Sequence, residues 1–244
     1  MNRVKITVVH HRSQHTPLAI LNQLPLGVIG YYLQERAVVD FVFVQDIDIG
    51  KALESDFVVI MGAMESVNDS TVSWLAHEAR LIKNLLNHQV RLFGICFGAQ
   101  HIAKILGGSV YKMVNPIVRL SDISLNRDGK LHPIFCGFPD QFKAISLHQD
   151  YIQLPLSAVP LAEGSGIMQA FSYENVVGVQ FHPEITSGLL NAFIQKRIKR
   201  SLAYHHMIPE CLLLKQRAAE YEKNLLHLGE LLADNILASI EEKV

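Results

Sequence analysis

Short apolar runs that alternate with longer helical patterns limit the possible folds of this chain more than any other feature. The apolar runs, five to seven residues each, are Val4–Val9, Val38–Val44, Phe57–Met61 and Arg91–Ile95. Helical patterns occupy roughly residues 26–36, 50–55, 73–88 and 97–106. Near-continuous apolar runs of this length are typical of strands buried on both faces. The alternation therefore predicts an α/β fold with a mostly parallel sheet and helices on both faces.

The pattern changes after Gly107-Gly108, which we expect to end the preceding helix. Further strands, partly antiparallel, are predicted at 109–112, 117–125, 142–147, 159–163, 167–172 and 176–181. From Ser187 onward the sequence is helical, with one predicted break at Ile208-Pro209. A leucine-rich stripe in the last helix could form a coiled-coil seam, but we expect it to pack on its own domain.

The 244 residues suit one domain with an appendage. We predict a three-layer, flavodoxin-like domain over residues 1–195. Residues 196–244 are predicted to form a helical extension that packs on this domain or on a partner.

Composition narrows the class of protein further. Hydrophobic residues make up 49% of the chain and the formal net charge is -1, which excludes a disordered chain and gives no electrostatic attraction to nucleic acid. Three cysteines form no disulfide framework, and no apolar stretch resembles a signal peptide or a membrane span. We therefore expect a cytoplasmic protein with no membrane or nucleic-acid partner. His10, His11 and His15 lack the spacing of metal ligands, so neither a metal nor a cofactor is expected.

A strained turn is predicted around Cys96. In the sequence Gly94-Ile95-Cys96-Phe97-Gly98, a strand runs into a nucleophilic residue that is flanked by glycines, and a helix follows. This is the nucleophile-elbow pattern, in which the helix N-terminus favours the thiolate form of the cysteine. The alternative is a small buried cysteine with no chemical role, which we expect for Cys136 and Cys211 instead.

A base for this thiolate is predicted at His182. The strand at 176–181 delivers His182 at its carboxyl end, and Glu184 follows two residues later, past a proline. Parallel sheets collect their active-site residues at this edge. Glu184 could then accept a hydrogen bond from the imidazole and fix its tautomer. Taken alone, His-Pro-Glu could equally be a surface turn.

These motifs, G-x-C-x-G-x-Q and G-x-Q-F-H-P-E in that order, resemble those of the class I glutamine amidotransferases. Within that family the chain looks most like stand-alone proteins similar to the amidotransferase domain of GMP synthase. Further matches are Val59-Ile60-Met61-Gly62, Gly107-Gly108-Ser109-Val110-Tyr111, Leu147-His148-Gln149-Asp150 and Gln169-Ala170-Phe171. The resemblance covers roughly residues 4–195.

The resemblance implies a Cys-His-Glu triad in which Cys96 attacks the side-chain amide of glutamine, His182 is the general base and acid, and Glu184 orients it. It implies a γ-glutamyl thioester and the release of ammonia. Backbone N–H groups of Phe97 and of the Gly62-Ala63 loop would form the oxyanion hole. Substrate binding would fall to Gln100, Gln149 and Asp150.

Two segments depart from the family's pattern. Its usual loop reads G-G-P-M-S-V, whereas this chain has Ala63 in place of the second glycine and lacks the proline. A positive φ at Ala63 would strain the backbone by on the order of 1 kcal/mol or more. Relatives commonly carry E-I-G-W where this chain has Asn115-Pro116-Ile117-Val118-Arg119-Leu120. The altered stretch removes polar contacts to the substrate, which predicts weak activity on free glutamine.

Several functions are compatible with this sequence. The first is a glutaminase that supplies ammonia to a separate synthetase subunit, because the sequence has no Walker A loop and no Ser-Gly-Gly-x-Asp loop. The second is a free-standing hydrolase of γ-glutamyl compounds. The others are a regulatory binding module with the same fold and a different cysteine hydrolase of this architecture.

Overall fold

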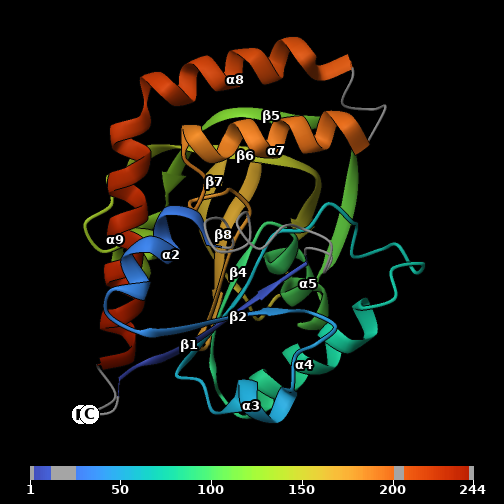
Figure 1. Ribbon diagram of the computed structural model, residues 1–244, viewed down its shortest axis with the longest axis vertical. Coiled ribbons are helices and arrows are strands. Elements are labelled where there is room, and N and C mark those ends of the chain that lie inside the picture. Colours follow the sequence, from blue (N-terminus) through green and yellow to red (C-terminus); the bar gives the residue numbers. More distant parts are fainter. Residues whose placement is uncertain (1–2, 12–25, 201–205, 242–244) are drawn as a thin grey trace.

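The computed structural model describes residues 3–11, 26–200 and 206–241, and this part of the chain builds one nine-stranded sheet flanked by helices (Figure 1). The strands are β1 (Lys5–His10), β2 (Val38–Phe43), β3 (Phe57–Ile60), β4 (Arg91–Ile95), β5 (Ser109–Leu125), β6 (Gln141–Gln153), β7 (Val159–Gly164), β8 (Ile167–Tyr173) and β9 (Val176–Val179). The helices are α2 (Gly27–Gln34), α3 (Ile49–Leu53), α4 (Leu75–Asn87), α5 (Phe97–Ile105), α6 (Arg127–Leu131), the 3-10 helix η1 (Pro133–Phe135), α7 (Ser187–Arg200), α8 (Ile208–Glu220) and α9 (Glu222–Glu241).

The strand order is β2-β1-β3-β4-β9-β8-β7-β5-β6. Neighbouring strands from β2 to β9 are parallel, and those from β9 to β6 are antiparallel. Each of the four apolar runs predicted as strands forms an observed strand, and the predicted and observed ends differ by at most one residue. The sheet is therefore mixed, and the predicted α/β class with partly antiparallel additions is confirmed.

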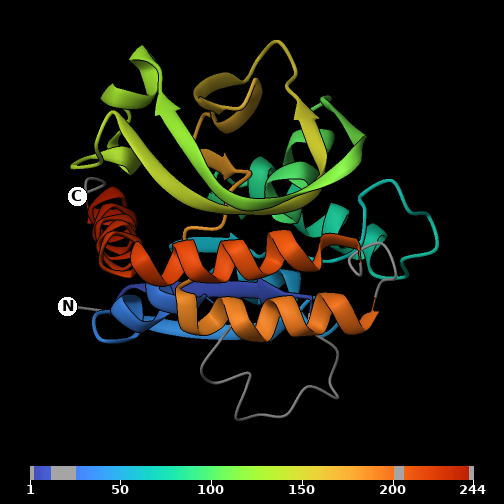
Figure 2. The same ribbon diagram turned by 90° about the horizontal axis from the view of Figure 1, so that it is seen from above.

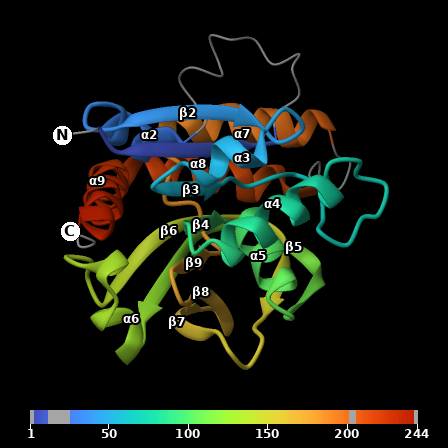
Figure 3. The same cartoon turned by 90° about the horizontal axis from the view of Figure 1, so that it is seen from below.

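Both faces of β1, β3 and β4 are buried, which explains their continuous apolar runs. β2 lies at the edge of the sheet and has only exposed and half-buried residues, so the burial expected for its apolar run was wrong. On β3, Val58 and Ile60 belong to the hydrophobic cluster that α4 and α5 cover, whereas Val59 faces the cluster that contains residues of α2 and α9. Figure 3 shows α3, α4 and α5 together on one side of these strands, with α2 and α7 on the other. The alternation follows from the two-residue period of a strand.

The strands predicted at 109–112 and 117–125 form a single long strand, β5, and in this respect the prediction was wrong. β5 pairs with β6 along most of its length, with a register shift between Lys112 and Ile117. Pro116 lacks an N–H for the ladder, and a bulge is where a strand accommodates proline. Figure 2 shows β5 and β6 curving together away from the parallel part of the sheet.

The C-terminal helices contain one break more than predicted, at Tyr221 between α8 and α9. α8 buries Leu214 and Ala218 in a cluster with residues of β5 and β6, whereas α9 buries Leu228 and Leu232 in the cluster that includes α2. A single straight helix cannot cover both surfaces. The leucine-rich stripe thus packs on the chain's own domain and does not form a free coiled-coil seam. The domain boundary near residue 195 stays a prediction.

Candidate active site

Cys96 lies in the strained turn that the sequence predicts. It joins β4 to α5 with φ 52° and ψ -104°, a region that residues with a side chain rarely adopt. A Cβ on Gly94 would lie 2.7 Å from Ala99 N, and a Cβ on Gly98 would lie 2.2 Å from Ile60 O. The two glycines are therefore required for α5 to pack this closely against the sheet.

The sheet brings Cys96 and His182 together because β4 and β9 are parallel neighbours. The backbone N–H of Cys96 donates to Val179 O at 2.8 Å, at the end of β9. The N–H of His182 donates to Ile145 O of β6, also at 2.8 Å. Both side chains are buried, with Cys96 and His182 only 3% and 2% exposed.

Glu184 accepts a hydrogen bond from His182. Its Oε1 lies 2.8 Å from His182 Nδ1, which places the proton on Nδ1. Burial alone would lower the pKa of His182, but the negative charges of the Glu184 carboxylate and of Cys96 outweigh it and raise the pKa to about 10. His182 Nε2 is buried and has no hydrogen-bond partner in the described part of the chain. The geometry favours an imidazolium whose second nitrogen remains available.

The start of α2 supports the backbone of Glu184. Val28 N donates to Glu184 O at 3.2 Å. Gly27 has φ +50°, and a Cβ there would lie 1.9 Å from the same oxygen. The glycine allows α2 to begin directly against the carboxylate-bearing turn.

The loop after β3 lies against both Cys96 and His182. A Cβ on Gly62 would be 3.1 Å from His182 Cε1 and 3.6 Å from Cys96 Cβ. Ala63 is not among the residues with positive φ, so the strain considered for it is absent. Lys104 of α5 holds the loop further on by donating to Val67 O at 2.7 Å. Phe97, the other predicted oxyanion donor, is the first residue of α5 and follows Cys96 directly.

The three predicted substrate-binding side chains all make hydrogen bonds within the protein. Gln100 Nε2 donates to Asp150 O at 3.1 Å, and Gln149 Nε2 donates to Met113 O at 3.1 Å. The Asp150 carboxylate accepts from Ser66 Oγ at 2.5 Å. These contacts link the loop after β3, α5 and the β5 bulge to β6.

Sequence reasoning missed Gln180 as a site residue. Gln180 is fully buried, and its Nε2 lies 3.6 Å from Cys96 Sγ, within hydrogen-bonding range of sulfur. Its Oε1 accepts from Gln100 Nε2 at 3.2 Å. The sequence did contain a signal for Gln180. It stands two residues before His182, just after the end of β9, at the edge of the sheet where active-site residues gather.

The three histidines considered as metal ligands do not form a site in the described residues. His15 lies outside the residues that the structure describes, and His11 makes a hydrogen bond to Glu78 instead. Across residues 3–11, 26–200 and 206–241, no group of three or more histidine, cysteine or acidic side chains could hold a metal ion.

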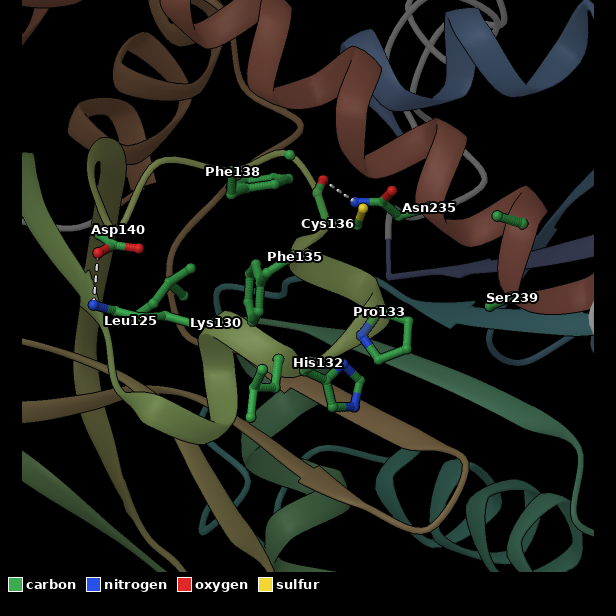
Figure 4. A pocket seen from close by; sticks show the side chains of 13 residues that line it. Leu125, Lys130, His132, Pro133, Phe135, Cys136, Phe138, Asp140, Asn235 and Ser239 are labelled. Atoms are coloured by element: carbon green, nitrogen blue, oxygen red, sulfur yellow. Dashed lines mark hydrogen bonds and ion pairs between the residues drawn. The ribbon is translucent and has the colours of Figure 1, made fainter.

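A separate pocket of about 440 Å³ lies beside α6, η1 and α9 (Figure 4). Asn235 of α9 borders it and donates to Cys136 O at 2.9 Å. Cys136 also borders it and is exposed, whereas Cys211 is buried. None of the predicted site residues lines this pocket.

The α/β fold thus brings Cys96, His182 and Glu184 together in a buried site at the carboxyl edge of the parallel strands. Residues 29–199 match the model of the family "Glutamine amidotransferase class-I". The chain belongs to the class I glutamine amidotransferase family.

Curated relatives include proteins named as GMP synthases and one named as a gamma-glutamyl peptidase. The chain is 32% identical over 186 residues to a subunit of a glutamine-hydrolyzing GMP synthase from Saccharolobus solfataricus, covering 75% of this chain and 90% of the relative. It is 28% identical over 211 residues to gamma-glutamyl peptidase 4 from Arabidopsis thaliana, covering 84% and 78%. A GMP synthase from Borreliella burgdorferi is 28% identical over 76% of this chain, and the match spans only 34% of that longer protein.

Solved structures confirm the fold. A glutamine amidotransferase from Thermotoga maritima superposes with a TM-score of 0.79 at 24% identity, covering 97% of this chain and 99% of that one. A protein from Thermoplasma acidophilum, described as one subunit of a GMP synthase, gives a TM-score of 0.61 at 23% identity, covering 91% and 99%. No helix in the part of the chain described here has the length and apolarity needed to span a membrane.

Proposed function

We propose that this protein is a cysteine-dependent hydrolase that cleaves the side-chain amide of glutamine, or of another γ-glutamyl compound, through a thioester on Cys96. One observation carries the proposal. Cys96 occupies a positive-φ elbow at the start of α5, beside the buried pair of His182 and Glu184. This combination supports the proposal, because thioester chemistry needs a nucleophile, a proton carrier and a group that orients the carrier.

In the first half of the proposed reaction, the Cys96 thiolate attacks the γ-carbonyl carbon. The carbonyl electrons move to the oxygen, which accepts hydrogen bonds from the N–H groups of Phe97 and Ala63. When the oxyanion collapses, the C–N bond breaks and imidazolium His182 gives its Nε2 proton to the departing nitrogen. The products are ammonia and a γ-glutamyl thioester.

In the second half, water hydrolyses the thioester. Neutral His182 takes a proton from the attacking water, the C–S bond breaks, and Cys96 leaves as a thiolate. Formation of the thioester removes the negative charge of Cys96, which is one cause of the raised pKa of His182, so the imidazolium gives up its proton more readily at this stage. The ion pair with Glu184 and Cys96 re-forms when the thiolate leaves and the proton returns. The complete cycle consumes one water molecule and restores the protein to its starting protonation state.

The ammonia acceptor is proposed to belong to a separate synthetase subunit. The support is the relative named as one subunit of a glutamine-hydrolyzing GMP synthase, of which this chain covers 90%. Released ammonia passes to water when no such synthetase is bound.

A γ-glutamyl peptide is the second candidate substrate. The relative named gamma-glutamyl peptidase 4 covers more of this chain than the GMP synthase relative does, 84% against 75%. The bulge of β5 also carries the altered stretch at 115–120, and Gln149 holds its backbone at Met113. This altered stretch is proposed to favour a larger γ-glutamyl compound over free glutamine.

Ammonia release from glutamine and amine release from a γ-glutamyl dipeptide test the proposal directly. Cys96→Ala should abolish both activities, while Cys136→Ala and Cys211→Ala should retain them as matched controls. Thermal unfolding of each variant separates loss of chemistry from loss of fold. If Cys96→Ala keeps more than about a tenth of either activity, the nucleophile assignment is wrong.

A further inference from the structure

A buried carboxylate that the proposed reaction does not use lies between two histidines. Glu78 is in the first turn of α4 and is fully buried. Its Oε1 is 2.6 Å from His11 Nε2, and its Oε2 is 2.6 Å from His101 Nδ1. His11 follows β1 and His101 is in α5, so one carboxylate joins three elements at the carboxyl edge of the sheet.

The charge of Glu78 is retained despite its burial. Burial by itself would raise the pKa of this carboxyl group, but His11 and His101 lower it to about 2. The carboxylate is therefore ionised at neutral pH. Keeping an ion in the interior is strongly unfavourable unless its partners are well placed. The Glu78 carboxylate therefore restricts where the rings of His11 and His101 can lie.

Both histidines that bind Glu78 also pack against Phe97. The ring of Phe97 lies 5.1 Å from the ring of His11 and 5.8 Å from that of His101, edge-on in both cases. The ring of Trp74 also packs against Phe97, with 5.3 Å between the ring centres. Phe97 is 1% exposed. Phe97 is the first residue of α5 and directly follows the strained Cys96.

We infer that Glu78 is a positioning residue for the chemistry at Cys96. It holds His11 and His101, which fix the Phe97 ring and so direct the Phe97 N–H toward the oxyanion. The inference rests on the proposed function. A backbone in a rarely populated conformation persists only when the surrounding structure fixes it, and this cluster supplies that restraint on one side of the elbow.

Two reagents separate positioning of the oxyanion donor from reactivity of the sulfur. A p-nitrophenyl ester acylates Cys96 through a tetrahedral oxyanion, whereas iodoacetamide alkylates the same sulfur by direct displacement, with no oxyanion. Both rates are followed by mass spectrometry of the peptide that contains Cys96. The full chain is used in a Cys136→Ala background, because Cys136 is exposed.

Removing the carboxylate should change one rate and not the other. Glu78→Ala should lower the acylation rate about tenfold to hundredfold, the range expected when a catalytic group is misplaced by about 1 Å, and leave alkylation within twofold. Glu78→Gln keeps the shape but loses the charge, and should lower acylation by at least about threefold. Leu85→Ala is the matched control, because it empties a buried position of α4 without touching the carboxylate. It should leave the ratio of the two rates unchanged.

The inference is overturned if acylation and alkylation fall together in Glu78→Ala, or if folded Glu78→Gln acylates at the parent rate. If Glu78→Ala does not fold, Glu78→Gln decides. Failure of the proposed function looks different. In that case the ester does not acylate Cys96 of the parent protein at all, whatever residue occupies position 78.

Discussion

Replacing Gly98 by alanine tests whether close packing of α5 sets the geometry of the elbow. A Cβ at this position would lie 2.2 Å from Ile60 O and 2.8 Å from Ile60 C, both of which are backbone atoms. Ordinary van der Waals contact begins at 3.4 Å, so α5 and the end of β3 must separate by about 1 Å. Gly62, which lies against Cys96 and His182, follows Ile60 by two residues.

The expected cost has two parts. Overpacking of this kind lowers the free energy of unfolding by about 1–3 kcal/mol. The displaced loop and helix should lower kcat/KM for ammonia or amine release by about a hundredfold. Urea denaturation measures the first effect, and the rate per folded molecule measures the second. Gly188→Ala is the matched control, since a Cβ there has no neighbour within 4 Å, and helix propensity predicts a gain of up to about 1 kcal/mol. Equal stability and activity in the two variants would refute the packing argument.

Three further predictions concern single side chains of the site. The pKa of His182 is raised from 6.5 to about 10 on folding, so the stabilisation it provides is complete below pH 6.5 and is lost as the pH rises through 10. The difference in unfolding free energy between wild type and His182→Gln should therefore shrink over that range, and a constant difference would contradict the ion pair. Gln180→Leu should lower kcat about tenfold or more, because it removes a hydrogen bond to the thiolate; an unchanged kcat in steady-state assays would count against that contact. Ala63→Gly should change turnover by less than about twofold, because no positive φ has to be relieved there, and a large gain would show otherwise.

The parallel half of the fold was predictable because burial on both faces leaves a simple pattern in the sequence. The strands β1, β3 and β4 appear as apolar runs because successive residues face hydrophobic clusters on opposite sides of the sheet. The sequence divides β5 in two because a proline such as Pro116 normally interrupts a strand. Only the pairing with β6 on both sides of the bulge shows that the strand continues. The break at Tyr221 depends on which surfaces α8 and α9 cover, and no local signal carries that information.

The predicted site residues were found where motif and topology coincide. Cys96 and His182 each follow a predicted strand and lie in a motif, but only the structure shows that these two strands are parallel neighbours. Glu78 could not be found in this way, because a glutamate in the first turn of an amphipathic helix is normally solvated. Its burial depends on His11 and His101, which are 67 and 23 residues away in the chain. Such a cluster becomes visible only when the three elements are assembled.

The covalent intermediate on Cys96 tests the central proposal most directly. The protein is mixed with a γ-glutamyl substrate, quenched with acid within a single turnover, and measured by intact mass and peptide mapping. The proposed reaction predicts the added mass of one γ-glutamyl group, located on Cys96, and none in Cys96→Ala. Substrate turnover by the wild type without any adduct on Cys96, or with the adduct on another residue, would contradict the thioester mechanism.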